Sequence, residues 1–217
     1  MKISSFSKSY GSRTVLRFPD LELPDGQIIA VIGSNGSGKS TLARILAGLE
    51  RSDQKRPPLA ALSVGYMPQK SYAFRMSVAR NLSLNGSDPE RREKLLRTLQ
   101  IDALAGHSAK RLSGGETAKM ALARLLMRDY ALLILDEPTA SMDVESTLAA
   151  ETLLSDYCRD TCAGILLVTH SLQQARRIAH HVLFLHEGEL REQGDAARLL
   201  SAPETNELRR FLEFYGI

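Results

Sequence analysis

The segment from Gly33 to Ser40 has the composition of a phosphate-binding loop. Its glycines let successive backbone N–H groups converge on an anion, and Lys39 and Ser40 add an ammonium group and a hydroxyl group. The segment follows an apolar run and opens a helical pattern, as the motif G-x-x-x-x-G-K-S/T requires. This agreement favours phosphate binding over an ordinary glycine-rich turn. The residues predicted to contact the phosphates are Gly33, Ser34, Asn35, Gly36, Ser37, Gly38, Lys39, Ser40 and Thr41.

Two acidic residues, Asp136 and Glu137, directly follow an apolar run at residues 132–135. Ligands of an open parallel sheet bind beyond the carboxyl ends of its strands, so both acids are expected at the edge that carries the loop. Successive side chains leave a strand in different directions. We therefore expect Asp136 to hold Mg²⁺ through water and Glu137 to polarise the water that attacks the γ-phosphate. A polar strand end that caps the next turn is the alternative for the pair taken alone.

His170 follows a third apolar run, residues 164–168, after one intervening threonine. At the same sheet edge its imidazole could donate to the γ-phosphate and position the attacking water. A single histidine at a strand end is more often structural. We interpret the histidines outside any motif in that way: His107, His180, His181 and His186.

A second glycine motif, Ser113-Gly114-Gly115-Glu116, precedes a long apolar helical pattern. Ser113 and Glu116 have the spacing of a capping box, which explains them structurally. It does not explain two glycines, each of which costs about 1 kcal/mol relative to alanine inside a helix. Glycine suits a helix start that something large must approach closely. We infer a second anion-binding helix N-terminus, which two chains facing head to tail could offer to each other's nucleotide.

These side chains need a scaffold, and the sequence predicts a mostly parallel sheet covered by helices, because strand-type runs alternate with helical patterns. The predicted strands are residues 27–32, 62–66, 131–135, 164–168 and 182–186. The predicted helices are residues 39–47, 116–127, 144–157, 171–179 and 196–215, and a helical pattern with polar breaks covers residues 72–110. The chain thus divides into an α/β core and a helical insertion near residues 71–111.

Composition excludes several classes of protein. The net charge of +3 over 217 residues, with basic pairs scattered along the chain, gives no nucleic-acid footprint. The start has no apolar signal segment, and the apolar runs are far shorter than a span of about 20 residues. The two cysteines are too few for a disulfide scaffold. We expect a cytoplasmic protein.

With these motifs in this order, the whole sequence resembles an ATP-binding cassette (ABC) ATPase subunit. The resemblance implies an α/β P-loop fold with a mostly parallel sheet, a helical subdomain and a reduced antiparallel β-subdomain. It implies one domain over residues 1–217, with residues 1–70 and 112–217 as a RecA-like core and residues 71–111 as the helical subdomain. ATP and Mg²⁺ are the implied ligands.

The resemblance also assigns roles. The segment from Ser113 to Glu116 is the signature that acts on the partner's ATP, and Asp143 lies at the dimer seam. Gln69 is the Q-loop glutamine near Mg²⁺, and Tyr10 stacks on adenine, although from the sequence alone ordinary packing is the more usual role of such a tyrosine. Glu116 departs from the more frequent glutamine. The segment between Gly48 and Gln69 is short.

Three functions follow as hypotheses. The first is the ATPase of a membrane transporter with a separate integral membrane permease, bound at the inner face of the membrane. An importer with an extracytoplasmic binding protein is favoured, and the stretch from Gln69 to Asn81 weakly resembles importers of oxyanions such as tungstate or phosphate. Tyr72, Phe74 and Met76 either line a groove for the permease or pack inside the helical lobe. The second hypothesis is a soluble ATPase for metallocluster assembly or cell division. A non-hydrolysing ATP-binding module is the third, and Lys39 with the catalytic candidates argues against it.

Overall fold

The structure is a computed structural model that describes residues 1–54, 57–59 and 62–215. Its strands are β1 (Lys2–Ile3), β2 (Phe6–Tyr10), β3 (Arg13–Phe18), β4 (Leu21–Glu22), β5 (Ile28–Ile32), β6 (Val64–Met67), β7 (Leu132–Asp136), β8 (Gly164–Val168), β9 (His181–His186) and β10 (Glu189–Asp195). Its α-helices are α1 (Lys39–Leu46), α2 (Val78–Ser83), α3 (Pro89–Thr98), α4 (Gly114–Leu125), α5 (Val144–Thr161), α6 (Leu172–Ile178), α7 (Ala196–Ser201) and α8 (Asn206–Phe214). The 3₁₀ turns η1 (Asp102–Leu104) and η2 (Ala109–Arg111) lie between α3 and α4.

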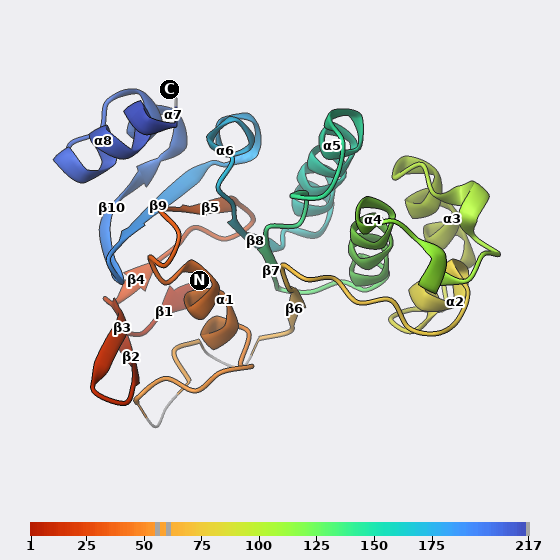
Figure 1. The fold of residues 1–217 in the computed structure, drawn as a ribbon, viewed down its shortest axis with the longest axis horizontal. Coiled ribbons are helices and arrows are strands. Elements are labelled where there is room, and N and C mark those ends of the chain that lie inside the picture. The colour runs from red at the N-terminus through yellow and green to blue at the C-terminus, as the bar shows by residue number, and fades with distance from the viewer. Residues whose placement is uncertain (55–56, 60–61, 216–217) are drawn as a thin grey trace.

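The main sheet has the strand order β2-β3-β10-β9-β5-β8-β7-β6 (Figure 1). The strands from β9 to β6 in this order run parallel to one another. β2 pairs antiparallel with β3, β10 pairs antiparallel with β9, and a separate antiparallel pair joins β1 and β4. This arrangement confirms the predicted α/β fold with a mostly parallel sheet.

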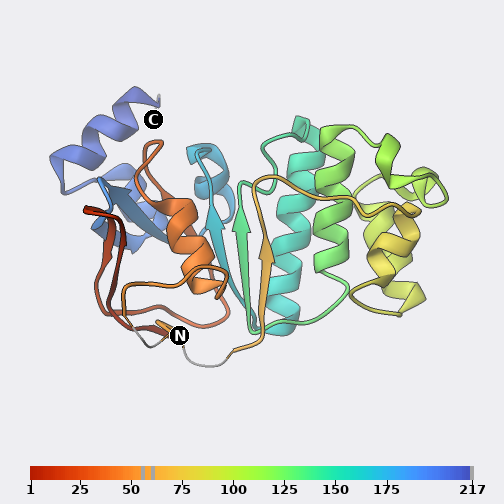
Figure 2. The ribbon, with the colours of Figure 1, turned by 60° about the horizontal axis from the view of Figure 1, so that its bottom comes forward.

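The central strands are buried on both faces, as parallel strands covered by helices must be. On β7, Leu133 and Leu135 belong to the core shared with α4 and α5. Leu132 and Ile134 point the other way, into the core around α1. Figure 2 shows α1 on one side of the sheet, α4 and α5 on the other, and α2 with α3 beyond α4. A third cluster packs α6, α7 and α8 near β9.

Three neighbouring strands end at one edge of this sheet. β5 runs into the glycine-rich loop, β7 ends at Asp136, and β8 ends two residues before His170. Because β5, β8 and β7 are adjacent and parallel, their carboxyl ends lie side by side. The fold thus places the predicted loop and the predicted polar residues at the same edge.

The sequence pattern does not predict the strands before β5 or strand β10. β10 carries charged side chains on both sides of its register, so it has no apolar run or clear alternation. Its partner β9 leads into it through a tight turn in which Glu187 and Gly188 both have positive φ angles, 49° and 79°. Such a turn matches the twist of an antiparallel hairpin. The antiparallel part of the fold therefore comes from residues 2–22 and 181–195.

Two helical predictions were too long. Residues 72–77 form no helix, because the Asn81 side chain bonds both the N–H and the C=O of Phe74 and holds this backbone in an irregular turn. The predicted helix over residues 196–215 is two helices, α7 and α8, separated at Pro203, which has no N–H to donate within a helix. None of the helices among the described residues is both long and apolar enough to cross a bilayer.

Candidate nucleotide site

The glycine-rich loop follows β5 in a conformation that only glycine adopts easily. Gly33, Gly36 and Gly38 have φ angles of 150°, 79° and 100°. A Cβ atom on Gly33 would lie 2.1 Å from the Leu185 carbonyl oxygen, so no other residue fits there. Helix α1 begins at Lys39 without a side-chain cap. Its first N–H groups and its positive dipole end are therefore available to an anion.

The Lys39 side chain is buried and arches back over the loop. Its Nζ donates to the carbonyl oxygens of Gly33 at 2.7 Å and Ser34 at 2.9 Å. Burial lowers the pKa of Lys39, and the nearby carboxylates of Glu137 and Asp136 oppose this shift. The ammonium group is thus fixed at the loop, where an anionic ligand would relieve its desolvation.

Ser40 and Asp136 meet across the edge between α1 and β7. The Ser40 hydroxyl donates to Asp136 Oδ1 at 3.2 Å. Burial raises the pKa of Asp136, and the hydrogen bond from Ser40 opposes the shift. A hydroxyl beside a buried carboxylate is the type of oxygen donor set that Mg²⁺ prefers, so these residues fit that ion. Gln69 lies two residues beyond β6, the neighbour of β7, and its exposed side chain makes no hydrogen bond with the described residues.

Glu137 and His170 form the closest contact between charged or titratable groups at this edge. Glu137 Oε2 lies 2.5 Å from His170 Nδ1, with the two side chains 11% and 58% exposed, respectively. Glu137 has a φ angle of 54°, which is uncommon for a residue other than glycine. Burial raises the pKa of Glu137, and His170 and Lys39 oppose the shift. The structure therefore brings a largely buried carboxyl group next to an accessible imidazole.

The second glycine motif opens α4 with the predicted capping box. The Ser113 hydroxyl accepts from the Glu116 N–H, and a Glu116 carboxylate oxygen accepts from the Ser113 N–H at 2.7 Å. The two glycines differ. A Cβ atom on Gly115 would lie 2.7 Å from the Ser141 carbonyl oxygen, so packing within this chain already requires that glycine. A Cβ atom on Gly114 would meet its nearest neighbour only at 3.9 Å, so this side of Gly114 is open.

Two further predicted residues have partners within the chain. Asp143 caps α5, since its carboxylate oxygens accept from the Ser146 N–H at 2.8 Å and the Ser146 hydroxyl at 2.9 Å. Tyr10 is 51% exposed at the end of β2, and its hydroxyl donates to Glu50. The Lys8 ammonium lies 4.9 Å from the centre of the Tyr10 ring. Lys8 and Glu50 were missed by the sequence analysis because neither belongs to a motif.

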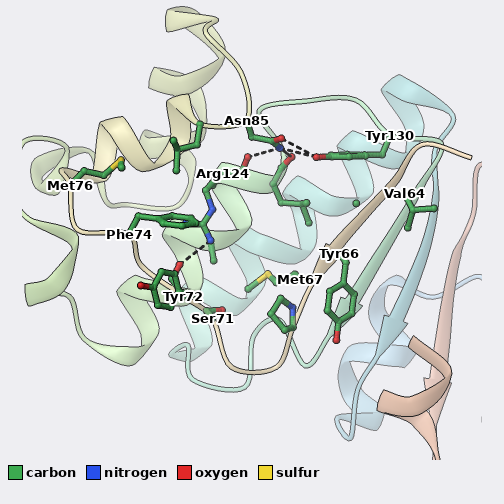
Figure 3. A pocket seen from close by; sticks show the side chains of 15 residues that line it. Val64, Tyr66, Met67, Ser71, Tyr72, Phe74, Met76, Asn85, Arg124 and Tyr130 are labelled. Atoms are coloured by element: carbon green, nitrogen blue, oxygen red, sulfur yellow. Dashed lines mark hydrogen bonds between the residues drawn. The ribbon is translucent and has the colours of Figure 1, made fainter. Parts of the chain in front are cut away.

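A groove of about 550 Å³ lies between β6, the segment of residues 68–76 and helix α4 (Figure 3). Tyr72, Phe74 and Met76 all line it, so these side chains border a groove rather than pack wholly inside the helical lobe. Tyr72 is 61% exposed and Phe74 is 42% exposed. The Arg124 guanidinium lies 5.1 Å from the centre of the Phe74 ring and donates to the Tyr72 carbonyl oxygen at 2.9 Å. The structure thus holds two aromatic rings at the mouth of a groove.

The fold and the edge geometry together define a P-loop ATPase. Comparison with known proteins gives the family: the family model described as ABC transporter matches residues 16–140. The chain is 37% identical over 207 residues to the ATP-binding protein TupC of a tungstate uptake system in Peptoclostridium acidaminophilum, covering 88% of this chain and 96% of that protein. It is 32% identical over 222 residues to the sulfate/thiosulfate import ATP-binding protein CysA of Nephroselmis olivacea, covering 94% of this chain and 65% of that protein. The chain belongs to the ABC transporter family, and it is an ATP-binding subunit with ATPase activity.

Solved structures support the same fold. A bacterial Atm1-family ABC exporter with ATP bound matches with a TM-score of 0.87 at 20% identity, covering all of this chain and 42% of that one. An ATP-binding subunit of an ABC transporter matches with a TM-score of 0.81 at 23% identity, covering 98% of both chains. A bacterial ABC transporter cassette solved as a dimer matches with a TM-score of 0.79 at 21% identity, covering 90% of this chain and 98% of that one.

Proposed function

We propose that this chain hydrolyses ATP to power an importer of oxyanions, working as a head-to-tail dimer beneath a separate integral membrane permease. The observation that carries the ATPase half of this proposal is the convergence of Lys39, Asp136 and the Glu137–His170 pair on one sheet edge. The import half is supported by the two relatives, whose names give tungstate uptake and sulfate or thiosulfate import. Tungstate, sulfate and thiosulfate are all oxyanions.

Within the site, the residues act on different parts of the nucleotide. The loop amides from Gly33 to Thr41 and the Lys39 ammonium bind the phosphates. Ser40, Asp136 and Gln69 would hold Mg²⁺, which would neutralise charge on the phosphate oxygens. Glu137 accepts a proton from the attacking water, and His170 positions that water and the γ-phosphate. Lys8 lies over one face of the Tyr10 ring, and the adenine base would stack on the other face.

The other chain of the dimer would complete the nucleotide-binding site. Helix α4 is capped by Ser113 and begins at Gly114, which has open space where a Cβ atom would lie, and such a helix start suits an anion from outside the chain. Gly115, Glu116 and Asp143 support this surface from within by shaping the helix start and the loop that packs against it. The related cassette that was solved as a dimer supports such an arrangement.

The groove beside β6 would receive a cytoplasmic helix of the permease. Its exposed aromatic rings, Tyr72 and Phe74, lie on the segment that links Gln69 to α2. A partner seated there would therefore be only a few residues of chain away from Gln69 at the nucleotide site. In this proposal residues 71–111 form a helical subdomain on a core made of residues 1–70 and 112–217. The chain would lie at the inner face of the membrane through the permease, with an extracytoplasmic binding protein supplying the substrate.

Capture from membranes tests the partner. Tagged chain purified from detergent-solubilised membranes should bring down an integral membrane protein. The double variant Tyr72→Ala/Phe74→Ala should lose that protein while keeping ATP hydrolysis. Phe214→Ala is a matched control, because Phe214 is 83% exposed on α8, outside the groove. A set of purely soluble partners would contradict the proposal and favour a non-transport complex.

Uptake tests the substrate. Uptake of radiolabelled tungstate, sulfate and phosphate is measured in cells with and without this chain. Cells that lack the chain should take up one of these anions more slowly than cells that carry it. Complementation with the Lys39→Ala variant should fail to restore uptake. Equal uptake of every oxyanion in both strains would contradict the import of these oxyanions.

A further inference from the structure

A partly buried hydrogen bond joins α6 to the segment that follows Glu137. Gln174 is 1% exposed and lies four residues after His170. Its Nε2 donates to Thr139 Oγ1 at 3.0 Å and to Glu151 Oε1 at 3.2 Å. Thr139 follows Glu137 by two residues, so this amide bridges the two chain segments that carry Glu137 and His170.

The Gln174 amide is held in one orientation. Glu151, 3% exposed on α5, accepts two hydrogen bonds of 2.7 Å from Arg177 Nε and Nη2. The Glu151 carboxylate is therefore held in place by two parallel hydrogen bonds from one guanidinium. If the amide were flipped, Gln174 Oε1 would face the Glu151 carboxylate, an acceptor against an acceptor. The Glu151–Arg177 ion pair thus aims the amide N–H at Thr139.

What this bridge restrains is a strained segment. Glu137 has a φ angle of 54°, a strained conformation for a residue other than glycine, which persists only where neighbouring structure fixes it. One restraint is the hydrogen bond from the Glu137 N–H to the Val168 carbonyl oxygen at 2.9 Å. The Gln174–Thr139 bond is a second restraint, on the far side of Glu137. Together they fix Glu137 against the segment that leads to His170.

We propose that Gln174 is a positioning residue for ATP hydrolysis, which holds Glu137 in line with His170 through Thr139. The inference rests on the roles proposed above for Glu137 and His170. Gln174 would act only through Thr139, without contact with the nucleotide or the attacking water. Its loss should therefore lower the rate of the chemical step and leave nucleotide binding intact, because misplacement of a catalytic group reduces the rate steeply.

Four variants test this inference through kcat and KM for ATP. Gln174→Leu and Thr139→Val each remove one partner with little change in volume, and each should lower kcat about tenfold with KM changed less than about twofold. The double variant should lie within about twofold of either single variant, because both remove the same bond. Thr139→Ser keeps the accepting hydroxyl and should keep kcat near the wild-type value.

A control separates positioning from stability. Tyr157→Phe removes a partly buried hydrogen bond with the Tyr130 N–H, and should lower the thermal midpoint while keeping kcat. Unchanged kcat in Gln174→Leu, a Thr139→Ser rate as low as that of Thr139→Val, or additive losses in the double variant would overturn the proposal. Full hydrolysis by Glu137→Gln would instead refute the role of Glu137 on which it rests.

Discussion

Glu137 Oε2 and His170 Nδ1 lie 2.5 Å apart although they follow different strands, β7 and β8. The parallel pairing of these strands brings Asp136 opposite Val168 and sets both segments at one edge. A base next to an orienting partner is the arrangement that activates water in many hydrolases. This contact makes Glu137 the first residue to test.

Replacing Glu137 with glutamine should stop turnover. The amide cannot accept the proton of the attacking water, and loss of a general base lowers rates about 10² to 10⁴-fold. Because the phosphate contacts remain, ATP should still bind and an ATP-bound dimer should accumulate. Phosphate release and gel filtration with ATP measure the two effects. Unchanged hydrolysis would contradict the assignment of Glu137 as the base.

The same substitution should change how stability depends on pH. Burial raises the pKa of Glu137 above its ordinary range. A carboxyl whose pKa is higher in the folded than in the unfolded state stabilises the fold below its unfolded pKa, and this contribution is lost as pH rises through the folded pKa. Above the folded pKa the wild type therefore carries a destabilising ionised carboxylate, which glutamine replaces with a neutral amide.

Glu137→Gln should accordingly melt at a higher temperature than wild type at pH 7.5, by about 2 to 4 °C for each 1 kcal/mol relieved. The difference should shrink as pH falls towards the ordinary pKa of glutamate. Glu213→Gln, at an exposed position of α8, is the control and should show no such trend. A difference in melting temperature that grows at low pH would show that the pKa of Glu137 is not raised on folding.

Substitutions of the two signature glycines, Gly114 and Gly115, should impair the protein in different ways. Gly114→Val has room in the isolated chain, so it should keep the melting temperature and lose hydrolysis by blocking a ligand from outside. Gly115→Ala sets a Cβ atom 2.7 Å from the Ser141 carbonyl oxygen, so it should lower the melting temperature itself. Calorimetry and ATPase assays on both variants check this. Equal melting losses would contradict the distinction.

Tyr10 should contribute through its ring rather than its hydroxyl. Tyr10→Ala removes the surface proposed for adenine and should raise KM for ATP about tenfold, since stacking of a base on an aromatic side chain is worth about 1 to 3 kcal/mol. Tyr10→Phe loses only the hydrogen bond to Glu50 and should keep KM near the wild-type value. A larger effect of phenylalanine than of alanine would show that the hydroxyl matters more.

Much of the site could be predicted because its residues lie at the ends of strong local patterns. The loop from Gly33 to Ser40 combines a motif with an apolar strand before it, and Asp136 and Glu137 end another apolar run. The rule that parallel strands share an edge then brings them together without knowledge of the strand order. His170 follows from the same rule.

The features of the fold and site that the sequence does not predict depend on contacts between distant segments of the chain. Gln174 is a polar residue in a helical pattern, where solvent exposure is the usual expectation, and only the packing of α5 against α6 buries it beside Thr139. Strand β10 has no periodic apolar pattern, since its pairing with β9 comes from a tight turn. The need for Gly115 depends on the approach of Ser141, which lies 26 positions further along the chain.

A mixing experiment tests most directly whether the site closes only between two chains. Lys39→Ala inactivates the loop and leaves the signature intact, whereas Gly114→Val does the reverse. Each variant alone should be inactive. In a head-to-tail dimer, the mixed pair combines one intact loop with one intact signature. An equal mixture should therefore recover about a quarter of wild-type ATP hydrolysis, because about half of the dimers are mixed and each has one complete site. If the mixture stays as inactive as its components, each chain uses its own signature or none, and the central claim is wrong.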